Sequence, residues 1–129
     1  MGITSAGLAE VCKLTGDTGS PTAFTYLAVG ETATAFAITQ TALAAEITGN
    51  GLARAAATVS TTTTTYTNDT LRLTETWSVS GTETVREVGI FNGSSGGDML
   101  GRKVTAQEYS LASGDEFTYT YDIIFAYQG

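Results

Sequence analysis

Apolar and polar residues alternate along much of the chain, which is typical of β-strands. The alternation is clearest over residues 117–127, where aromatic or large aliphatic side chains occupy every second position. Residues 70–79 follow the same pattern, and shorter apolar segments cover 84–91 and 99–106. Since successive side chains of a strand point to opposite faces, each segment predicts a strand with a buried face.

Two further strands are predicted in the first half of the chain. Residues 23–29 are largely apolar on both faces, which is typical of a central strand buried on both sides. Residues 53–66 predict a long strand that is bulged or bent, and it pairs with residues 70–79 in a hairpin. The five threonines at 61–65 favour an exposed edge.

A short helix is predicted over residues 5–14, with Ser5 as its N-terminal cap. Its apolar side chains share one face, which carries Leu8, Val11, Cys12 and Leu14. A polar loop follows at 15–22. We therefore expect residues 1–22 to form an N-terminal arm, which either docks on a neighbouring subunit or folds back on its own sheet.

Residues 39–47 predict a second helix of one to two turns, with a threonine as cap and Gly49 or Gly51 as stop. Residues 23–129 are expected to form one domain. Its regularly spaced strands and polar turns predict an all-β fold, a single antiparallel β-sandwich or jelly-roll-like domain with one or two short helices. The predicted core contains Leu71, Leu73, Trp77, Val88, Ile90, Tyr119, Tyr121, Ile123 and Phe125.

Short motifs around the predicted turns point to a family. They are Val88-Gly89-Ile90-Phe91, Met99-Leu100-Gly101-Arg102 and Leu111-Ala112-Ser113-Gly114-Asp115, preceded upstream by the segments 23–30 and 40–43. Over roughly residues 22–125, the chain resembles small structural proteins of tailed bacteriophages, of the decoration or tail type. The resemblance implies a β-rich virion protein that is assembled in the host cytoplasm.

Charge narrows the choice of partners. The chain has six Lys and Arg against thirteen Asp and Glu, a net charge of −7. Backbone binding to nucleic acid requires clustered cations, so DNA and RNA binding are disfavoured, and the outside of a shell is favoured over its DNA-facing lumen. No apolar run approaches the ~20 residues of a membrane span. Cys12 is the only cysteine and is expected to be a small buried apolar side chain.

Candidate chemistry is sparse. The chain has no histidine, which excludes Ser-His and Cys-His nucleophile arrangements. The carboxylates near predicted turns are Glu83, Glu87, Asp98, Asp115 and Glu116. Solvated acidic side chains at strand ends are common, and the ordered spacing of a calcium loop is absent around Asp98 and Asp115. We therefore expect no enzyme activity, no cofactor, and no catalytic or metal-binding residue.

Three charged or aromatic features leave alternatives open. Arg86 and Glu87 form either a salt bridge at the rim or an intersubunit contact. Glu75 falls on an apolar face, where it either pairs with an arginine or marks a β-bulge. The aromatic stripe from Phe117 to Phe125 is expected to be one half of the core, and its alternative role is stacking on sugars.

These observations favour a phage virion structural protein, namely a capsid decoration (cement) protein on the outer shell. The alternative is a tail, baseplate or fibre-attachment component, and a carbohydrate-binding module is the third candidate. The expected partners are other copies of the chain, in a homo-oligomer such as a trimer, and the major capsid protein or a tail protein.

Overall fold

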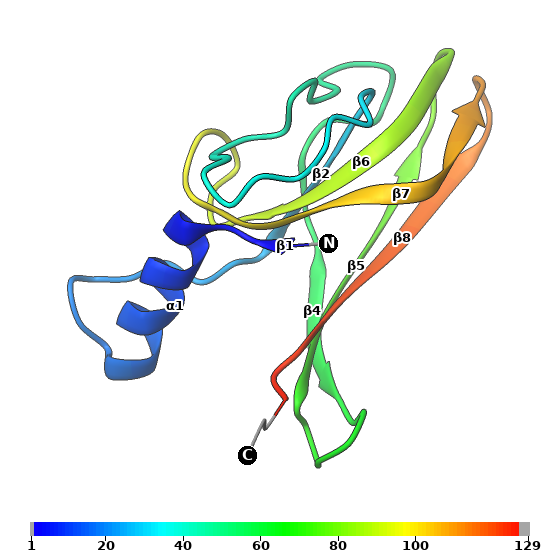
Figure 1. Cartoon of the computed structure of the whole chain (residues 1–129). Coiled ribbons are helices and arrows are strands. Elements are labelled where there is room, and N and C mark those ends of the chain that lie inside the picture. The colour runs from blue at the N-terminus through cyan, green and yellow to red at the C-terminus, as the bar shows by residue number, and fades with distance from the viewer. Residues whose placement is uncertain (1, 127–129) are drawn as a thin grey trace.

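The computed structural model describes residues 2–126, and within this range the chain forms two antiparallel sheets and one helix (Figure 1). The helix is α1 (Ser5–Gly16). The strands are β1 (Gly2–Ile3), β2 (Tyr26–Gly30), β3 (Ala55–Ala56), β4 (Thr58–Thr62), β5 (Thr70–Ser78), β6 (Glu83–Phe91), β7 (Met99–Leu111) and β8 (Glu116–Ile124). The protein is therefore mostly β, as the alternation of residues predicts.

Five strands form one sheet in the order β1-β7-β6-β2-β3, and three form the other in the order β4-β5-β8. The predicted hairpin of β4 and β5 is confirmed, because Thr58 pairs with Thr74 and Thr62 with Thr70. β5 and β8 pair without a register shift from Thr70 to Ser78. Glu75 therefore marks no bulge, and among the described ion pairs it has no arginine partner.

The main core lies between the two sheets. Six of the nine predicted core residues are buried there: Leu73, Trp77, Val88, Ile90, Tyr121 and Ile123. Leu71 and Tyr119 are partly buried and pack against this cluster. The prediction for Phe125 is wrong, since this side chain is 56% exposed. β8 ends at Ile124, so Phe125 follows the strand and does not continue its buried face. Tyr127, at the end of the predicted strand, lies outside the described residues.

The five-stranded sheet is buried on its other face as well. Ala28, Phe91 and Met99 form a second cluster there with Leu43. The connection between β2 and β3 lies over β2 and β6 and supplies Leu43 (Figure 1). β2 is thus buried on both faces, as its apolar sequence predicts.

The helix predicted at residues 39–47 is absent, and this segment is an irregular loop. The amides of Ala44 and Ala45 donate hydrogen bonds to the Glu87 carboxylate, at 3.4 and 3.0 Å. Glu31 donates its backbone N–H to the Ala45 carbonyl at 3.0 Å, and Glu46 forms an isolated bridge with Gly30. The backbone groups that a helix would pair internally are therefore committed to other segments.

The first helix is confirmed but begins with a different cap and presents a different face. Thr4, and not Ser5, accepts the hydrogen bond from the amide of Gly7, at 2.9 Å. Gly7 faces β7 so closely that a Cβ atom at this position would lie 2.5 Å from the Leu100 carbonyl oxygen. The side of the helix that meets the sheet is thus the Gly7 side, which leaves Leu8 and Cys12 exposed. The expectation that Cys12 is buried is wrong.

The predicted strand 53–66 is divided between the two sheets. β3 pairs with β2 in one sheet and β4 with β5 in the other, with a break at Ala57, whose amide donates to the Thr25 carbonyl at 2.8 Å. β4 is an edge strand, as its threonines predict. β7 is longer than predicted and has register shifts against β6.

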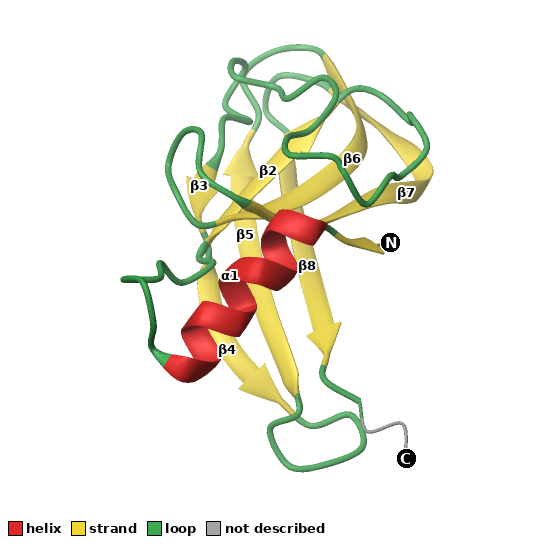
Figure 2. Ribbon diagram, turned by 60° about the vertical axis from the view of Figure 1, so that its left-hand side comes forward, coloured by secondary structure: helices red, strands yellow, loops and turns green. Residues whose placement is uncertain are grey.

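The two sheets are not closed around the core. They lie close together near the turn between β7 and β8 and diverge toward the other end, where β4, β5 and β8 extend past the five-stranded sheet (Figure 1). α1 lies beside the diverging end, on the side of β4 and β5 (Figure 2). This divergence creates the surface described next.

Candidate protein-binding cleft

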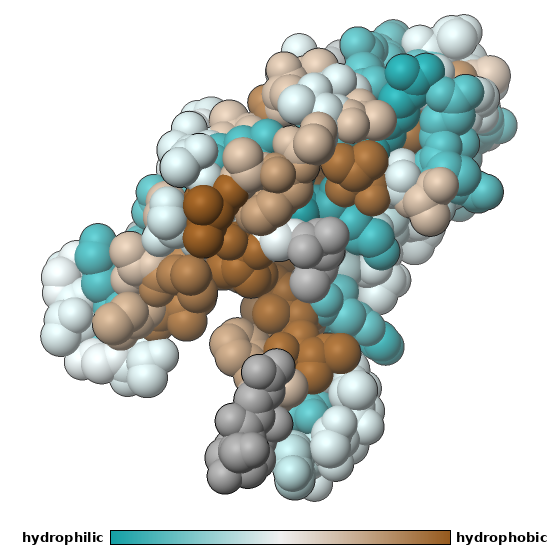
Figure 3. Space-filling view, viewed as in Figure 1, coloured by the Kyte–Doolittle hydropathy of each residue, from teal (hydrophilic) through white to brown (hydrophobic). Residues whose placement is uncertain are grey.

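An apolar cleft separates α1 from the extended end of the three-stranded sheet. Figure 3 shows hydrophobic side chains gathered in this notch, with more polar residues over the tips on both sides. The cleft consists of two adjoining hollows of about 420 and 360 Å³. Val11, Leu100 and Phe125 line both hollows. The first also contains Ile3, Leu8, Ile123, Ile124 and Ala126, and the second contains Leu14, Thr15, Ala23, Phe24, Thr25, Val59 and Leu71.

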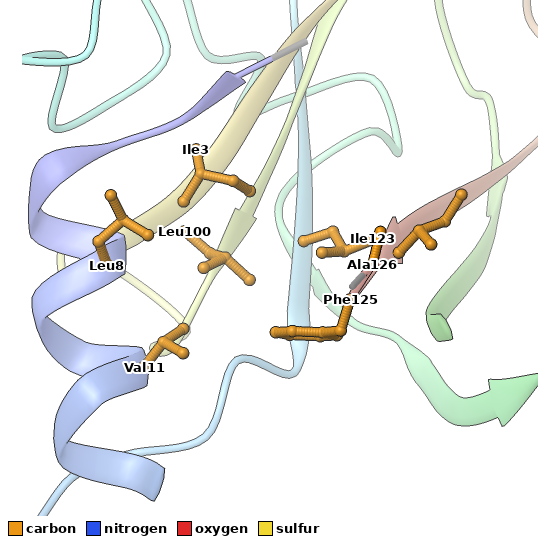
Figure 4. A pocket seen from close by; sticks show the side chains of 8 residues that line it. Ile3, Leu8, Val11, Leu100, Ile123, Phe125 and Ala126 are labelled. Carbon is orange, nitrogen blue, oxygen red and sulfur yellow. The ribbon is translucent and has the colours of Figure 1, made fainter. Parts of the chain in front are cut away.

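The walls of the first hollow come from segments far apart in the sequence. Ile3, Leu8 and Val11 lie on one side with Leu100, whereas Ile123, Phe125 and Ala126 lie on the other and face them across a shared space (Figure 4). Leu8 is 52% exposed and Ile124 is 49% exposed. Exposed large apolar side chains that adjoin one another are typical of surfaces that bind protein or other apolar partners.

Hydrogen bonds fix the helix side of the cleft. Thr4 donates its backbone N–H to the Leu100 carbonyl at 3.0 Å, and its hydroxyl donates to the carbonyl of Met99. Glu10 is buried and accepts from Asn92 Nδ2 at 3.1 Å and from the amide of Thr22 at 3.3 Å. α1 is thereby attached to β7 and to the loops on both sides, so the cleft has a defined shape.

The carboxylates considered in the sequence do not form a catalytic pair. Glu87 is fully buried and accepts a hydrogen bond from Arg102 Nε at 2.7 Å, and Arg102 Nη2 lies 2.6 Å from the same carboxylate in an ion pair. Asp115 accepts from the amide of Ala112 at 2.8 Å and so closes the turn between β7 and β8. Asp98 donates its amide to Asn92, which shapes the Gly-rich loop between β6 and β7.

Glu83 is near another acid. It accepts from Asn50 Nδ2 at 2.8 Å, and its hydrogen bond with Glu31 raises the pKa of the Glu31 carboxyl. Glu116 lies at the exposed start of β8. Across residues 2–126, no three His, Cys, Asp or Glu side chains are grouped so that they could hold a metal ion.

Arg86 and Glu87 do not pair with each other. They are consecutive residues of β6, so their side chains lie on opposite faces. Arg86 instead forms an exposed ion pair with Glu108 at 2.6 Å, so the predicted salt bridge between Arg86 and Glu87 is wrong. The buried pair of Glu87 with Arg102 was missed, because the two residues are fifteen positions apart and no local pattern connects them.

Two rings of the aromatic stripe, those of Phe117 and Tyr121, belong to the interior. Phe117 packs against Trp77 with ring centroids 5.9 Å apart and against Tyr109 at 5.3 Å. Tyr121 is buried, and burial raises the pKa of its phenol. The rings of Phe117 and Tyr121 are therefore unavailable for stacking on a sugar.

Comparison with known proteins does not place the chain in a family. No protein-family model matches the sequence, and no curated protein matches it. Among the described residues there is no helix long and apolar enough to cross a membrane. The cleft is the candidate site because exposed apolar side chains adjoin in it. It was missed at the sequence level because residues such as Phe125 and Leu8 were assigned to the core or to one face of a helix.

Proposed function

We propose that this chain is a structural protein of a bacteriophage virion, and that it is a decoration protein bound to the outside of the capsid through the apolar cleft. It is not an enzyme, and it acts by binding the major capsid protein and further copies of itself. We also propose that its two sheets are the layers of a β-sandwich that is open at the cleft end.

The apolar cleft is the main observation that supports this proposal. Its walls are apolar and its helix side is held by hydrogen bonds. Five of its large apolar side chains remain exposed in the single chain: Leu8, Leu14, Val59, Ile124 and Phe125. A hydrophobic side chain from another protein would gain about 25 cal/mol for each Å² of apolar surface removed from water. The resemblance of short motifs such as Val88-Gly89-Ile90-Phe91 to those of phage structural proteins is the reason for proposing a virion.

The charge of the chain supports a position on the outer surface. A net charge of −7 gives repulsion from packaged DNA and favours contact with the outside of the shell. Four arginines also form ion pairs with acidic side chains of the same protein: Arg54, Arg72, Arg86 and Arg102. Their charges are already neutralised and therefore do not favour binding to the phosphates of packaged DNA, which supports the outer position.

Binding to purified particles tests the proposal. Leu8→Asp and Ile124→Asp place a charge in the first hollow at exposed positions, so both variants should fold. We expect each to lose at least tenfold in affinity for capsids that lack the protein. Ile38→Asp is the control, because Ile38 is equally exposed but lies outside the cleft.

The alternative is a tail, baseplate or fibre-attachment component, which would use the same cleft on a different partner. Labelled protein is incubated with separated capsids and tails, and binding to tails alone would replace the capsid assignment. Binding to neither particle would contradict a virion role. A glycan array tests the carbohydrate-binding candidate, and retention of a glycan there would also contradict the proposal.

A further inference from the structure

We propose that β4 is a self-association surface, and that its free edge pairs with β4 of a second copy of this chain about a two-fold axis. The resulting sheet would run continuously through six strands. The proposed function includes binding between copies of this chain, and β4 is the surface that would make this contact. The inference therefore rests on the proposed function.

The first observation is that β4 is an open edge, since no strand within residues 2–126 pairs with its outer side. Four of its five residues are exposed and the fifth is half-buried, and its pairing with β5 runs without a register shift. An edge strand presents unpaired backbone N–H and C=O groups, which proteins usually protect with charges, proline, bulges or short length. β4 is the Thr58–Thr62 segment TVSTT, which has none of the first three.

The other described sheet edges carry such protection. β1 and β3 are two residues long. β8 carries Glu116 and Asp122. β7, which β1 covers only at Gly101 and Arg102, carries Lys103 and Glu108 and has register shifts against β6. The contrast within one molecule indicates that the edge of β4 is left available for another strand.

The second observation is electrostatic. Two chains of net charge −7 repel each other over most of their surfaces. From Ala55 to Asn68, however, the chain has no charged residue. In a two-fold contact the same segment lies on both sides of the interface. A charged edge strand would therefore face a like charge on the second copy. β4 is uncharged, so two copies of it can pair without this repulsion.

The third observation concerns buried area. A strand of five residues is about 17 Å long, which is too little for the ~800 Å² per partner of a standard interface. Val59 is 41% exposed and lines the second hollow beside Leu14 of α1. A second copy on the β4 edge would bring its own Val59 and Leu14 to the same seam, which adds apolar area to the backbone hydrogen bonds. The first hollow remains free for the particle.

Paired charge variants at the centre of β4 test the inference. Ser60→Lys and Ser60→Glu should each give a single chain of 13.4 kDa by light scattering, whereas the unchanged protein should have twice that mass. An equimolar mixture of the two variants should restore the double mass, because the charges then attract across the two-fold axis. Thr120→Lys, at an exposed position of β8, should keep the double mass.

Cross-linking provides a second measurement. In a Cys12→Ser background, which removes the exposed native thiol, Ser60→Cys should oxidise to a covalent dimer and Thr120→Cys should not. A single-chain mass for the unchanged protein, or a trimer unaffected by either Ser60 variant, would overturn the β4 contact. If such a trimer still binds capsids, the β4 contact is wrong but the proposed function is not. Failure of the β4 contact can therefore be distinguished from failure of the proposed function.

Discussion

Single polar side chains hold several loops of this protein in place. The carboxylate of Asp69 accepts hydrogen bonds from the amides of Thr64, Thr65 and Tyr66, at 2.8, 2.9 and 2.8 Å. These bonds favour the charged form, and those from Tyr66 and Thr64 contribute most to lowering the pKa of the Asp69 carboxyl below its ordinary value of 3.8. The loop after β4 is therefore ordered by one residue at its far end.

This arrangement predicts an acid-sensitive loop. Since the pKa of Asp69 is lower in the folded than in the unfolded chain, its stabilising effect is complete above the unfolded value of 3.8 and is lost as the pH falls below it. Hydrogen exchange at the amides of Thr64 to Tyr66 should accelerate in that acidic range beyond the intrinsic change. Asp69→Asn should exchange fast at neutral pH and lose this pH dependence, and slow exchange in the variant would contradict the assignment.

A second prediction at this scale concerns Tyr121. Its hydroxyl is buried and has no hydrogen-bond partner among the described residues. Removing an unpaired buried hydroxyl avoids its desolvation cost, so Tyr121→Phe should stabilise the fold by about 1 kcal/mol. Urea unfolding measures the change, and a loss of stability of that size would show that the hydroxyl is bonded. Sequence alternation predicts the burial of Tyr121 but not the environment of its oxygen, which depends on Gly101 and Arg102 of another strand.

At the scale of elements, the buried pair of Glu87 and Arg102 joins three segments. Glu87 on β6 receives the amides of Ala44 and Ala45, and Arg102 on β7 donates to the Thr34 carbonyl at 2.7 Å. One ion pair thus fixes the loop that covers the second cluster at two points, Thr34 and the Ala44-Ala45 pair. The loop has few backbone hydrogen bonds of its own and depends on these charges.

Breaking the pair should therefore be costly. Glu87→Gln leaves the Arg102 charge buried without a carboxylate, and we expect a loss of about 3–5 kcal/mol in the free energy of unfolding. Glu108→Gln is the matched control, because it breaks the exposed pair with Arg86 and should cost about 0–1 kcal/mol. Equal values for the two variants in chemical denaturation would show that the buried pair has no special role.

The loop held by Glu87 shows what could not be predicted from the sequence. The long alternating strands β5, β6 and β8 were predicted because a two-residue period is a local signal. The helix at 39–47 was predicted from local propensity as well, and it is wrong because Glu87, more than forty residues away, binds the amides of this segment. The pattern of residues within one segment does not indicate a contact with a residue so far away in the sequence.

At the scale of the whole molecule, the two ends of the sheet pair have different roles. Near the turn between β7 and β8, the sheets meet and Trp77 is buried, with its indole N–H donating to the Ala53 carbonyl at 2.9 Å. At the other end the sheets diverge, and Phe125 is exposed in the cleft. Alternation predicts that a strand has a buried face, but it does not specify whether another sheet or an open cleft lies opposite.

Truncation at the two ends should separate stability from binding. Trp77→Ala should cost roughly 3–5 kcal/mol, because it leaves a cavity in the closed end. Phe125→Ala should change the free energy of unfolding by less than about 1 kcal/mol, since most of its ring already contacts water, but it should weaken binding at the cleft. Thermal unfolding and particle binding are measured on both variants, and a large loss of stability for Phe125→Ala would mean that the cleft is closed in solution.

The attachment of α1 to β7 also has a consequence for the order of events during synthesis. Thr4 bonds to Met99, 95 residues later in the chain, and β1 pairs with Gly101 and Arg102. Contacts between such distant residues are entropically slow to form, and they require most of the chain to have left the ribosome. The residues of β1 and α1 are thus made well before their partners on β7 and dock late. Until then, Leu100 and the neighbouring apolar side chains are uncovered, which is the interval when a nascent chain is most exposed to aggregation or to capture by a chaperone.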